Sequence, residues 1–248
     1  MVVMFFLVLL SFFGMVVLRD STRFVVVKYH VACPKLRKKC RIVMMSDLHN
    51  KVYGKHNKRL LQAVRAQKPD LVLIAGDMVT ANGDKTEVQG PLELIRRLAL
   101  HYPVYYGIGN HEYRIKVCRG EYGNIYREYA AALKKCGVRV LENGRVYLPE
   151  YNMEICGLEI ERCYYKRLWK KHMDKEYIKS LLGKGRTDCT EVLIAHNPDY
   201  FKKYAAWGAD LVLAGHVHGG VMRLPLLGGV VSPAAHLFPK YDGRLDED

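Results

Sequence analysis

The sequence predicts an α/β fold in which two stacked β-sheets lie between outer helices, preceded by an N-terminal transmembrane helix. Three observations support this prediction. Short and almost continuously apolar segments recur along the chain, as expected for strands that are buried on both faces of a sheet. Amphipathic helical segments separate several of them, in the strand–helix–strand pattern of parallel sheets. A cluster of short strand-like segments in the middle of the chain indicates a second sheet.

The N-terminal 18 residues contain no charged side chain and predict a membrane anchor. As a helix they would rise about 27 Å, close to the ~30 Å hydrocarbon core of a bilayer. A cleavable signal peptide is the alternative interpretation. However, a basic segment before the apolar run is absent, and no small-x-small cleavage site follows it. We therefore expect an uncleaved single-pass anchor over residues 1–18.

A basic segment follows the anchor, over residues 19–40. Residues 1–41 hold eight basic side chains and one acidic side chain, which gives +7, half of the formal net charge of +14. Such a segment is expected to contact anionic lipid headgroups and to keep the C-terminal domain on the cytoplasmic side, with the exported side as the alternative. The overall positive charge also suits phosphorylated substrates or nucleic acid.

The seven cysteines predict free thiols rather than disulfides. Their number is odd, no C-x-x-C pair occurs, and a chain of 248 residues is long enough to form a core without disulfides. A reducing compartment agrees with the cytoplasmic orientation.

The elements of the expected sheets follow one another in order. The first half alternates strands and helices, the helices ending at Lys68-Pro69 or Gly137: Ile42–Met45, Asn57–Gln67, Leu71–Ala75, Leu92–Leu100, Val104–Ile108 and Ile125–Cys136. Around Asn143-Gly144, a strong tight-turn signal, the segments Val138–Leu141 and Val146–Leu148 predict a hairpin of the second sheet. The remaining segments again alternate between strands and helices: Met153–Cys156, His172–Leu182, Val192–Ala195, Asp199–Trp207 and Leu211–Ala214.

Polar side chains follow each of five strand segments directly. They are two aspartates, five histidines, two asparagines and a glutamate: Asp47, His49, Asp77, Asn110, His111, Glu112, His196, Asn197, His216 and His218. Because the carboxyl ends of parallel strands share one edge of a sheet, these side chains are expected to converge on one cleft. Carboxylate, imidazole and amide groups suit manganese, iron or zinc, and seven such ligands fit two ions about 3.5–4 Å apart. Glycines before Asp77, Asn110 and His216 are expected to permit sharp turns.

These motifs, D-x-H, G-D, G-N-H-E, H and G-H-x-H in this order over about residues 41–220, resemble the signature of the calcineurin-like metallophosphoesterases. The neighbouring stretches SDLHN, KPDLVLIAGDM, AHNPDYF, GHVHGG and LPLLGG are similar to the membrane-associated subgroup that contains YkuE, YaeI and LpxG. The resemblance implies a phosphodiesterase or pyrophosphatase that acts on a lipid-linked or nucleotide-sugar phosphate at the membrane surface. It also implies two divalent ions, for which we expect Mn²⁺, with iron or zinc as alternatives.

Carried over residue by residue, the resemblance implies a role for each group in the motifs. Asp47, His49 and His218 would hold one ion, Asn110, His196 and His216 the other, and Asp77 both, with a hydroxide between the ions as nucleophile. His111 would stabilise or protonate the leaving oxygen rather than bind metal. Glu112 is expected to orient His111.

The catalytic domain is expected to span residues 41–248, with a C-terminus shorter than the family pattern after Phe238-Pro239-Lys240-Tyr241. Two stretches are expected to determine specificity, 113–123 and 163–171. The basic aromatic run 162–171 predicts either recognition of a lipid or phosphate or a solvated helix start. Two alternative functions stay open: a nuclease with the same centre, although nucleic acid is not the expected partner, and a membrane-tethered metal-binding protein without catalysis. The oligomeric state is not predicted.

Overall fold

The computed structural model describes residues 4, 6–8, 11, 14, 15, 23–166, 171–217, 222–224 and 228–231. The expected anchor over residues 1–18 therefore lies mostly outside the described residues. In the part of the chain that is described, no helix is both long and apolar enough to span a bilayer. All seven cysteines are free, as expected.

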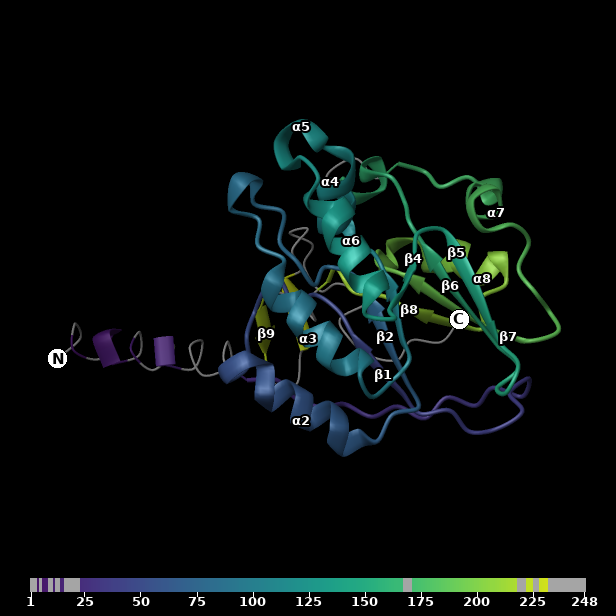
Figure 1. The fold of residues 1–248 in the computed structure, drawn as a ribbon, viewed down its shortest axis with the longest axis horizontal. Helices are drawn as coiled ribbons and strands as arrows, with labels where there is room; N and C mark the ends of the chain where they lie inside the picture. Colours follow the sequence, from purple (N-terminus) through teal and green to yellow (C-terminus); the bar gives the residue numbers. More distant parts are fainter. Residues whose placement is uncertain are drawn as a thin grey trace.

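The first sheet consists of four parallel strands. Their spatial order follows the sequence: β1 (Ile42–Met45), β2 (Leu71–Ala75), β3 (Val104–Gly107) and β4 (Arg139–Leu141). Four helices pack on its outer face: α2 (Lys58–Gln67), α3 (Gln89–Ala99), α4 (Asn110–Val117) and α6 (Ile125–Lys135). The short helix α5 (Arg119–Tyr122) follows α4, and neither of these two helices was predicted. Figure 1 shows α2, α3 and α6 together on one side of the strands.

The second sheet also has four strands, in the order β5 (Gly144–Leu148), β6 (Met153–Leu158), β7 (Thr190–Ala195) and β8 (Leu211–Leu213). The β5–β6 pair is antiparallel, and the other two pairs are parallel. Helices α7 (Lys175–Leu182) and α8 (Phe201–Trp207) lie over the outer face of this sheet. Strands β9 (Met222–Leu224) and β10 (Gly228–Val231) form a separate antiparallel pair.

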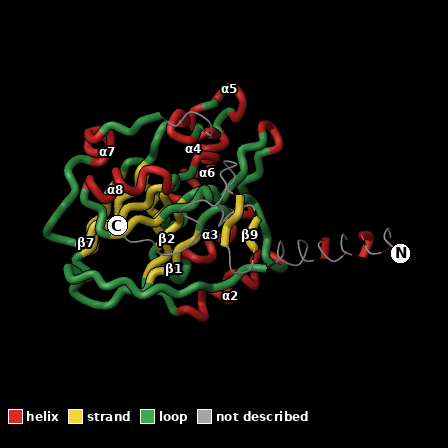
Figure 2. The backbone as a smooth tube through the Cα atoms, turned by 180° about the vertical axis from the view of Figure 1, so that it is seen from behind, coloured by secondary structure: helices red, strands yellow, loops and turns green. Residues whose placement is uncertain are grey.

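The two sheets face each other, which confirms the predicted layered α/β architecture. Side chains along β2 alternate between the two interiors: Leu71, Leu73 and Ala75 pack between the sheets, whereas Val72 and Ile74 pack under the helices. Each of these five residues is at most 1% exposed. Burial on both faces explains why the segment reads as continuously apolar. From behind, the strands of both sheets lie between the helices (Figure 2).

The predicted hairpin around Asn143-Gly144 is wrong. Asn143 does adopt the left-handed conformation of a tight turn (φ 52°), but the strands on either side belong to different sheets. β4 pairs with β3 in the first sheet, and β5 pairs with β6 in the second. The turn therefore transfers the chain from one sheet to the other, and the only hairpin among the described strands of the second sheet is β5–β6.

The basic segment before β1 packs partly on the domain. Lys35 forms an ion pair with Asp210 (2.7 Å), and the Arg37 guanidinium donates to the Pro149 carbonyl (3.0 Å). Leu36 and Cys40 join the core between the sheets. Residues 35–40 therefore pack against the two-sheet domain.

Candidate metal centre

The expected site residues lie where five strands end. Asp47 and His49 follow β1, Asp77 follows β2, and Asn110 and His111 begin α4 directly after the β3 segment. His196 follows β7 in the second sheet, and His216 follows β8. The parallel strands place all these ends at one edge of the sandwich. His218 lies outside the described residues.

Two carboxylates lie between two imidazoles at the centre of the site. His49 Nε2 is 3.8 Å from both Asp47 Oδ1 and Asp77 Oδ2. On the other side, His196 Nε2 is 3.8 Å from Asp47 Oδ1 and 3.1 Å from Asp77 Oδ2. Asp77 thus belongs to two groups of donors whose atoms lie within 4.8 Å of one another, one with His49 and His111 and one with His196 and His216.

Hydrogen bonds fix the direction of both imidazoles. His196 Nδ1 lies 2.6 Å from the Ala75 carbonyl oxygen, so Nδ1 carries a hydrogen, and Nε2 is the nitrogen that offers a lone pair once the ring is neutral. His49 Nδ1 lies 3.4 Å from Thr80 Oγ1, and its Nε2 likewise faces the carboxylates. This arrangement of an anchored Nδ1 and an inward Nε2 is typical of metal-binding histidines.

Asn110 supplies an independent indication that a cation fits here. Its Oδ1 is buried and has no hydrogen-bond partner in the structure. A buried amide oxygen without a partner costs free energy, and such atoms are rare unless a ligand satisfies them. The donor set of carboxylate, imidazole and amide oxygen matches the needs of divalent ions. The residues present therefore fit a two-metal centre.

The pKa values of three candidate ligands also favour the binding of a cation. Burial opposes ionisation of Asp77, but His196 and His111 outweigh it and hold the pKa of Asp77 well below its usual range. Burial would lower the pKa of His196, yet the Asp77 and Asp47 carboxylates raise it to about 10. Burial and the positive His196 lower the pKa of His216 to about 4. A proton on His196 therefore holds a place that a metal cation can take.

Comparison with protein-family models identifies the family to which the chain belongs. The family model for calcineurin-like phosphoesterases matches residues 40–220. The chain belongs to this family. The calcineurin-like phosphoesterases use a dinuclear centre of divalent metal ions, and the two donor groups around Asp77 are the candidates for that centre in this chain.

Curated relatives of the chain come from distant organisms. A putative metallophosphoesterase of Caenorhabditis elegans is 29% identical over 73% of the chain and 37% of its own length. The uncharacterized metallophosphoesterase YkuE of Bacillus subtilis is 27% identical over 78% of the chain and 63% of its own length. Phosphodiesterase YaeI of Escherichia coli is 27% identical over 67% of the chain and 55% of its own length. The chain thus spans between 37 and 63% of the length of these relatives.

The backbone of the candidate metal centre adopts an unusual conformation. Four of the candidate ligands have positive φ angles: Asp47 (54°), His49 (48°), Asp77 (51°) and His216 (69°). This left-handed region is unfavourable for residues other than glycine, and such strain concentrates at functional sites. The expectation of a glycine turn is confirmed at Gly76 (φ 84°). Gly215 serves a different purpose, because a Cβ there would collide with Ser46 Oγ and the Asp47 carboxylate.

Glu112 does not orient His111, contrary to expectation. Its fully buried carboxylate accepts hydrogen bonds from four backbone amides and the Tyr106 hydroxyl. The donors are Asp77 N (2.8 Å), Met78 N (2.9 Å), Val79 N (3.4 Å), Gly109 N (2.9 Å) and Tyr106 Oη (2.6 Å). Glu112 therefore ties the loop after β2 to the start of α4. The physical reason is that a buried carboxylate needs several donors, which these backbone amides supply.

His111 is fixed by the backbone instead. The Ala81 amide donates to His111 Nδ1 (2.9 Å), so neutral His111 carries its hydrogen on Nε2. Its own amide donates to Asp77 Oδ1 (2.9 Å). The ring lies edge-on to His49, with ring centroids 4.9 Å apart. An imidazole that presents N–H rather than a lone pair suits hydrogen donation better than metal binding.

A third group of donors does not resemble a metal site. Glu154, Cys156 and Glu191 lie close together in the second sheet. However, the Arg145 guanidinium already forms ion pairs with both glutamates. The position that a cation would take is therefore filled by a side chain of the protein.

Two residues at the centre were not predicted. Asn50 connects the loops after β1 and β2, because its Oδ1 accepts from Thr80 N (2.6 Å) and its Nδ2 donates to the Glu87 carbonyl (2.5 Å). Tyr165 ends a short 3-10 helix (Arg162–Tyr165), and its ring lies 5.2 Å from that of His216. Tyr164, in the same basic aromatic run (residues 162–171), is 4% exposed and belongs to the core. Neither of the two interpretations of residues 162–171 predicted the contact between Tyr165 and His216.

Replacing Tyr165 with alanine is expected to weaken metal binding about tenfold, because its ring supports His216 and, at 6.2 Å, His196. Tyr165→Phe keeps the ring and is expected to stay within about twofold of the wild type. Calorimetric titration of the metal-free protein with Mn²⁺ measures both values. Equal affinities for the wild type and the alanine variant would show that the ring plays no part in holding the histidines.

Proposed function

We propose that the chain is a metal-dependent hydrolase of phosphodiester or pyrophosphate bonds that acts at a membrane surface. The observation that carries the proposal is the meeting of candidate ligands from five separate strand ends around Asp77. Membership of the calcineurin-like phosphoesterases supports the reaction class. A relative named phosphodiesterase, YaeI, supports the diester substrate.

The proposed assignment of ligands keeps Asp77 with His49 in one donor group and with His196 and His216 in the other, and it leaves out His111. Asp47, His49 and the unplaced His218 hold one ion, Asn110, His196 and His216 hold the other, and Asp77 contacts both. When bound, the two divalent ions supply Lewis acidity towards phosphoryl oxygens and a lowered pKa for water. Mn²⁺ is the proposed metal, because oxygen and imidazole donors without thiolates suit it.

His111 is the proposed catalytic hydrogen donor. Its Nδ1 accepts from the Ala81 amide, so neutral His111 carries its hydrogen on Nε2 and can donate it. A donor in this position stabilises or protonates the leaving oxygen as the phosphorus–oxygen bond breaks. Glu112 contributes indirectly, because it holds the loop that carries Asp77.

The proposed substrate is a lipid-linked or nucleotide-sugar phosphate. The apolar run at residues 1–18 and the basic residues after it support a membrane anchor with the catalytic domain on the cytoplasmic side. An active site held beside a bilayer meets lipid-linked substrates at high local concentration.

The test is hydrolysis of bis-p-nitrophenyl phosphate by full-length protein that has been stripped of metal. Turnover is expected to appear on addition of Mn²⁺ and to stop when a chelator is added. The monoester p-nitrophenyl phosphate serves as the matched substrate and is expected to react more slowly. Absence of turnover with Mn²⁺, Fe²⁺ and Zn²⁺ alike would overturn the proposal and favour a metal-binding protein without catalysis.

A further inference from the structure

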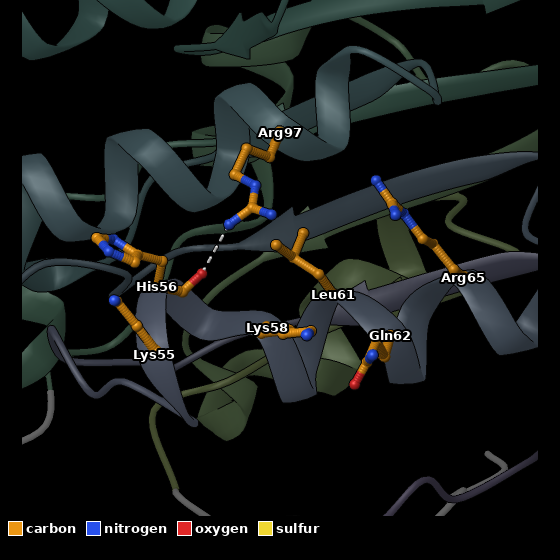
Figure 3. Close-up of a pocket in the computed structure, with 7 residues that line it drawn as sticks. All are labelled: Lys55, His56, Lys58, Leu61, Gln62, Arg65 and Arg97. Carbon is orange, nitrogen blue, oxygen red and sulfur yellow. Dashed lines mark hydrogen bonds between the residues drawn. The ribbon is translucent and has the colours of Figure 1, made fainter.

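A basic pocket lies between α2 and α3, made by residues outside the metal centre. Its volume is about 280 Å³, and seven residues line it: Lys55, His56, Lys58, Leu61, Gln62, Arg65 and Arg97. Four of these side chains are cationic at neutral pH, and none of the seven is acidic. In Figure 3, Leu61 and Arg65 extend from α2 towards the helix that carries Arg97, whereas Gln62 extends away from it.

The walls of the pocket are fixed by hydrogen bonds from opposite sides. Arg97 extends from α3 and donates to the His56 carbonyl (3.0 Å), whereas Arg65 extends from α2 and hydrogen-bonds to His101 Nε2 (2.8 Å). Leu61, only 3% exposed, lies between them as an apolar floor. Two guanidinium groups are thus held in place before any ligand arrives.

The charge and size of the pocket point to a phosphate group as its ligand. Like charges that share a small space repel one another, and an anion relieves this repulsion. Guanidinium groups match phosphate oxygens in geometry, and lysines add point charges. Glu93, the acidic side chain paired with His56 (3.7 Å), is not among the lining residues. A volume just below the range of roughly 300–1,000 Å³ for small-molecule sites suits a headgroup rather than a whole metabolite.

The surroundings of the pocket indicate where that phosphate comes from. The ring of Phe24 packs against that of Tyr53 at 5.0 Å, and the Tyr53 carbonyl accepts from the Arg59 amide (3.2 Å), so the chain at residue 24 lies close to the N-terminal end of α2. Next to this contact, aliphatic side chains are open to solvent: Val25 is 83% exposed, Val27 59% and Val52 54%. Exposed apolar side chains next to a basic cluster are the pattern of a surface that meets an anionic membrane. Single-stranded nucleic acid is disfavoured, since no Phe, Tyr or Trp lines the pocket for base stacking.

We propose that the pocket between α2 and α3 binds the phosphate of an anionic phospholipid headgroup and so orients the domain on the membrane. The apolar residues around Val25 then contact the lipid surface while the four cationic side chains hold the headgroup. This role is independent of the chemistry at the metal centre, because none of the lining residues belongs to that centre.

The test measures binding of the full-length chain to lipid vesicles by flotation. Neutral phosphatidylcholine vesicles are compared with vesicles that contain about 30% phosphatidylglycerol. The wild type is expected to bind the anionic vesicles at least about tenfold more strongly. Lys55→Glu combined with Lys58→Glu changes two exposed side chains of the pocket and is expected to weaken binding to the anionic vesicles about tenfold, whereas the contribution of the basic residues 19–40 remains.

A matched control separates the pocket from general surface charge. Arg127→Glu combined with Lys135→Glu changes two exposed side chains of α6 and lowers the net charge by the same four units, from +14 to +10. This control is expected to keep the wild-type preference. Equal losses in both variants, or no preference in the wild type, would overturn the proposal. Release from the vesicles by inorganic phosphate at the concentration of lipid phosphate would also overturn it, in favour of a soluble ligand.

Discussion

Substitution of Asp77 by asparagine is expected to lower the proposed turnover of bis-p-nitrophenyl phosphate by at least about 10³-fold. Asp77 is the one side chain common to both donor groups, and its Oδ2 lies 3.1 Å from His196 and 3.8 Å from His49. Divalent ions contribute several kcal/mol to stabilising the transition state, and about 4 kcal/mol corresponds to about 10³-fold in rate. Asparagine removes the charge but keeps an oxygen that accepts from the His111 amide. The loss is therefore expected without collapse of the α4 start.

Two measurements separate this loss from misfolding. Metal content per chain is expected to fall below that of the wild type, whereas far-ultraviolet circular dichroism stays unchanged. Asp84→Asn removes an exposed carboxylate from a neighbouring loop and is expected to keep full activity and metal content. Wild-type activity in the Asp77→Asn variant would contradict the assignment of Asp77 to the metal centre.

The strands that lead to the site could be predicted because each appears in the sequence as a short, continuous apolar segment. β1 and β2 have the predicted bounds to the residue. β2 is buried throughout and must therefore be apolar on both faces, whereas the edge strand β1 is apolar although its Met44 is 38% exposed. The strands with which β4 and β5 pair could not be predicted. The Asn143-Gly144 turn determines only that the chain bends, whereas the sheet that each strand joins depends on long-range packing.

The site shows the same division between local and long-range information. Candidate ligands could be found because they directly follow strands whose ends must share an edge. The partners of Glu112 could not, because three of its five donors lie 33 to 35 positions away, in the loop after β2. Tyr165 comes from a connecting segment with no periodic pattern, so no sequence signal places its ring against His216.

The second large effect is expected at this glutamate: Glu112→Gln should destabilise the protein by about 3 kcal/mol. The amide group has nearly the same shape as the carboxylate, but its NH₂ end faces donors that need acceptors. Two amides, from Asp77 and Gly109, reach one oxygen, and three further donors reach the other. Each unsatisfied buried donor costs about 1–3 kcal/mol. Thermal unfolding is expected to shift down by about 6–12 °C for a chain of this size.

Two comparison variants make the result interpretable. Tyr106→Phe removes one of the five donors and is expected to cost only about 1 kcal/mol. Glu128→Gln, on the exposed face of α6, is expected to change stability by less than about 0.5 kcal/mol. If Glu112 acted mainly by orienting His111, Glu112→Gln would lower turnover while leaving the unfolding temperature unchanged. The hydrogen bonds of the carboxylate predict a different result. The loop that carries Asp77 loosens in the variant, so both the unfolding temperature and the affinity for metal decrease.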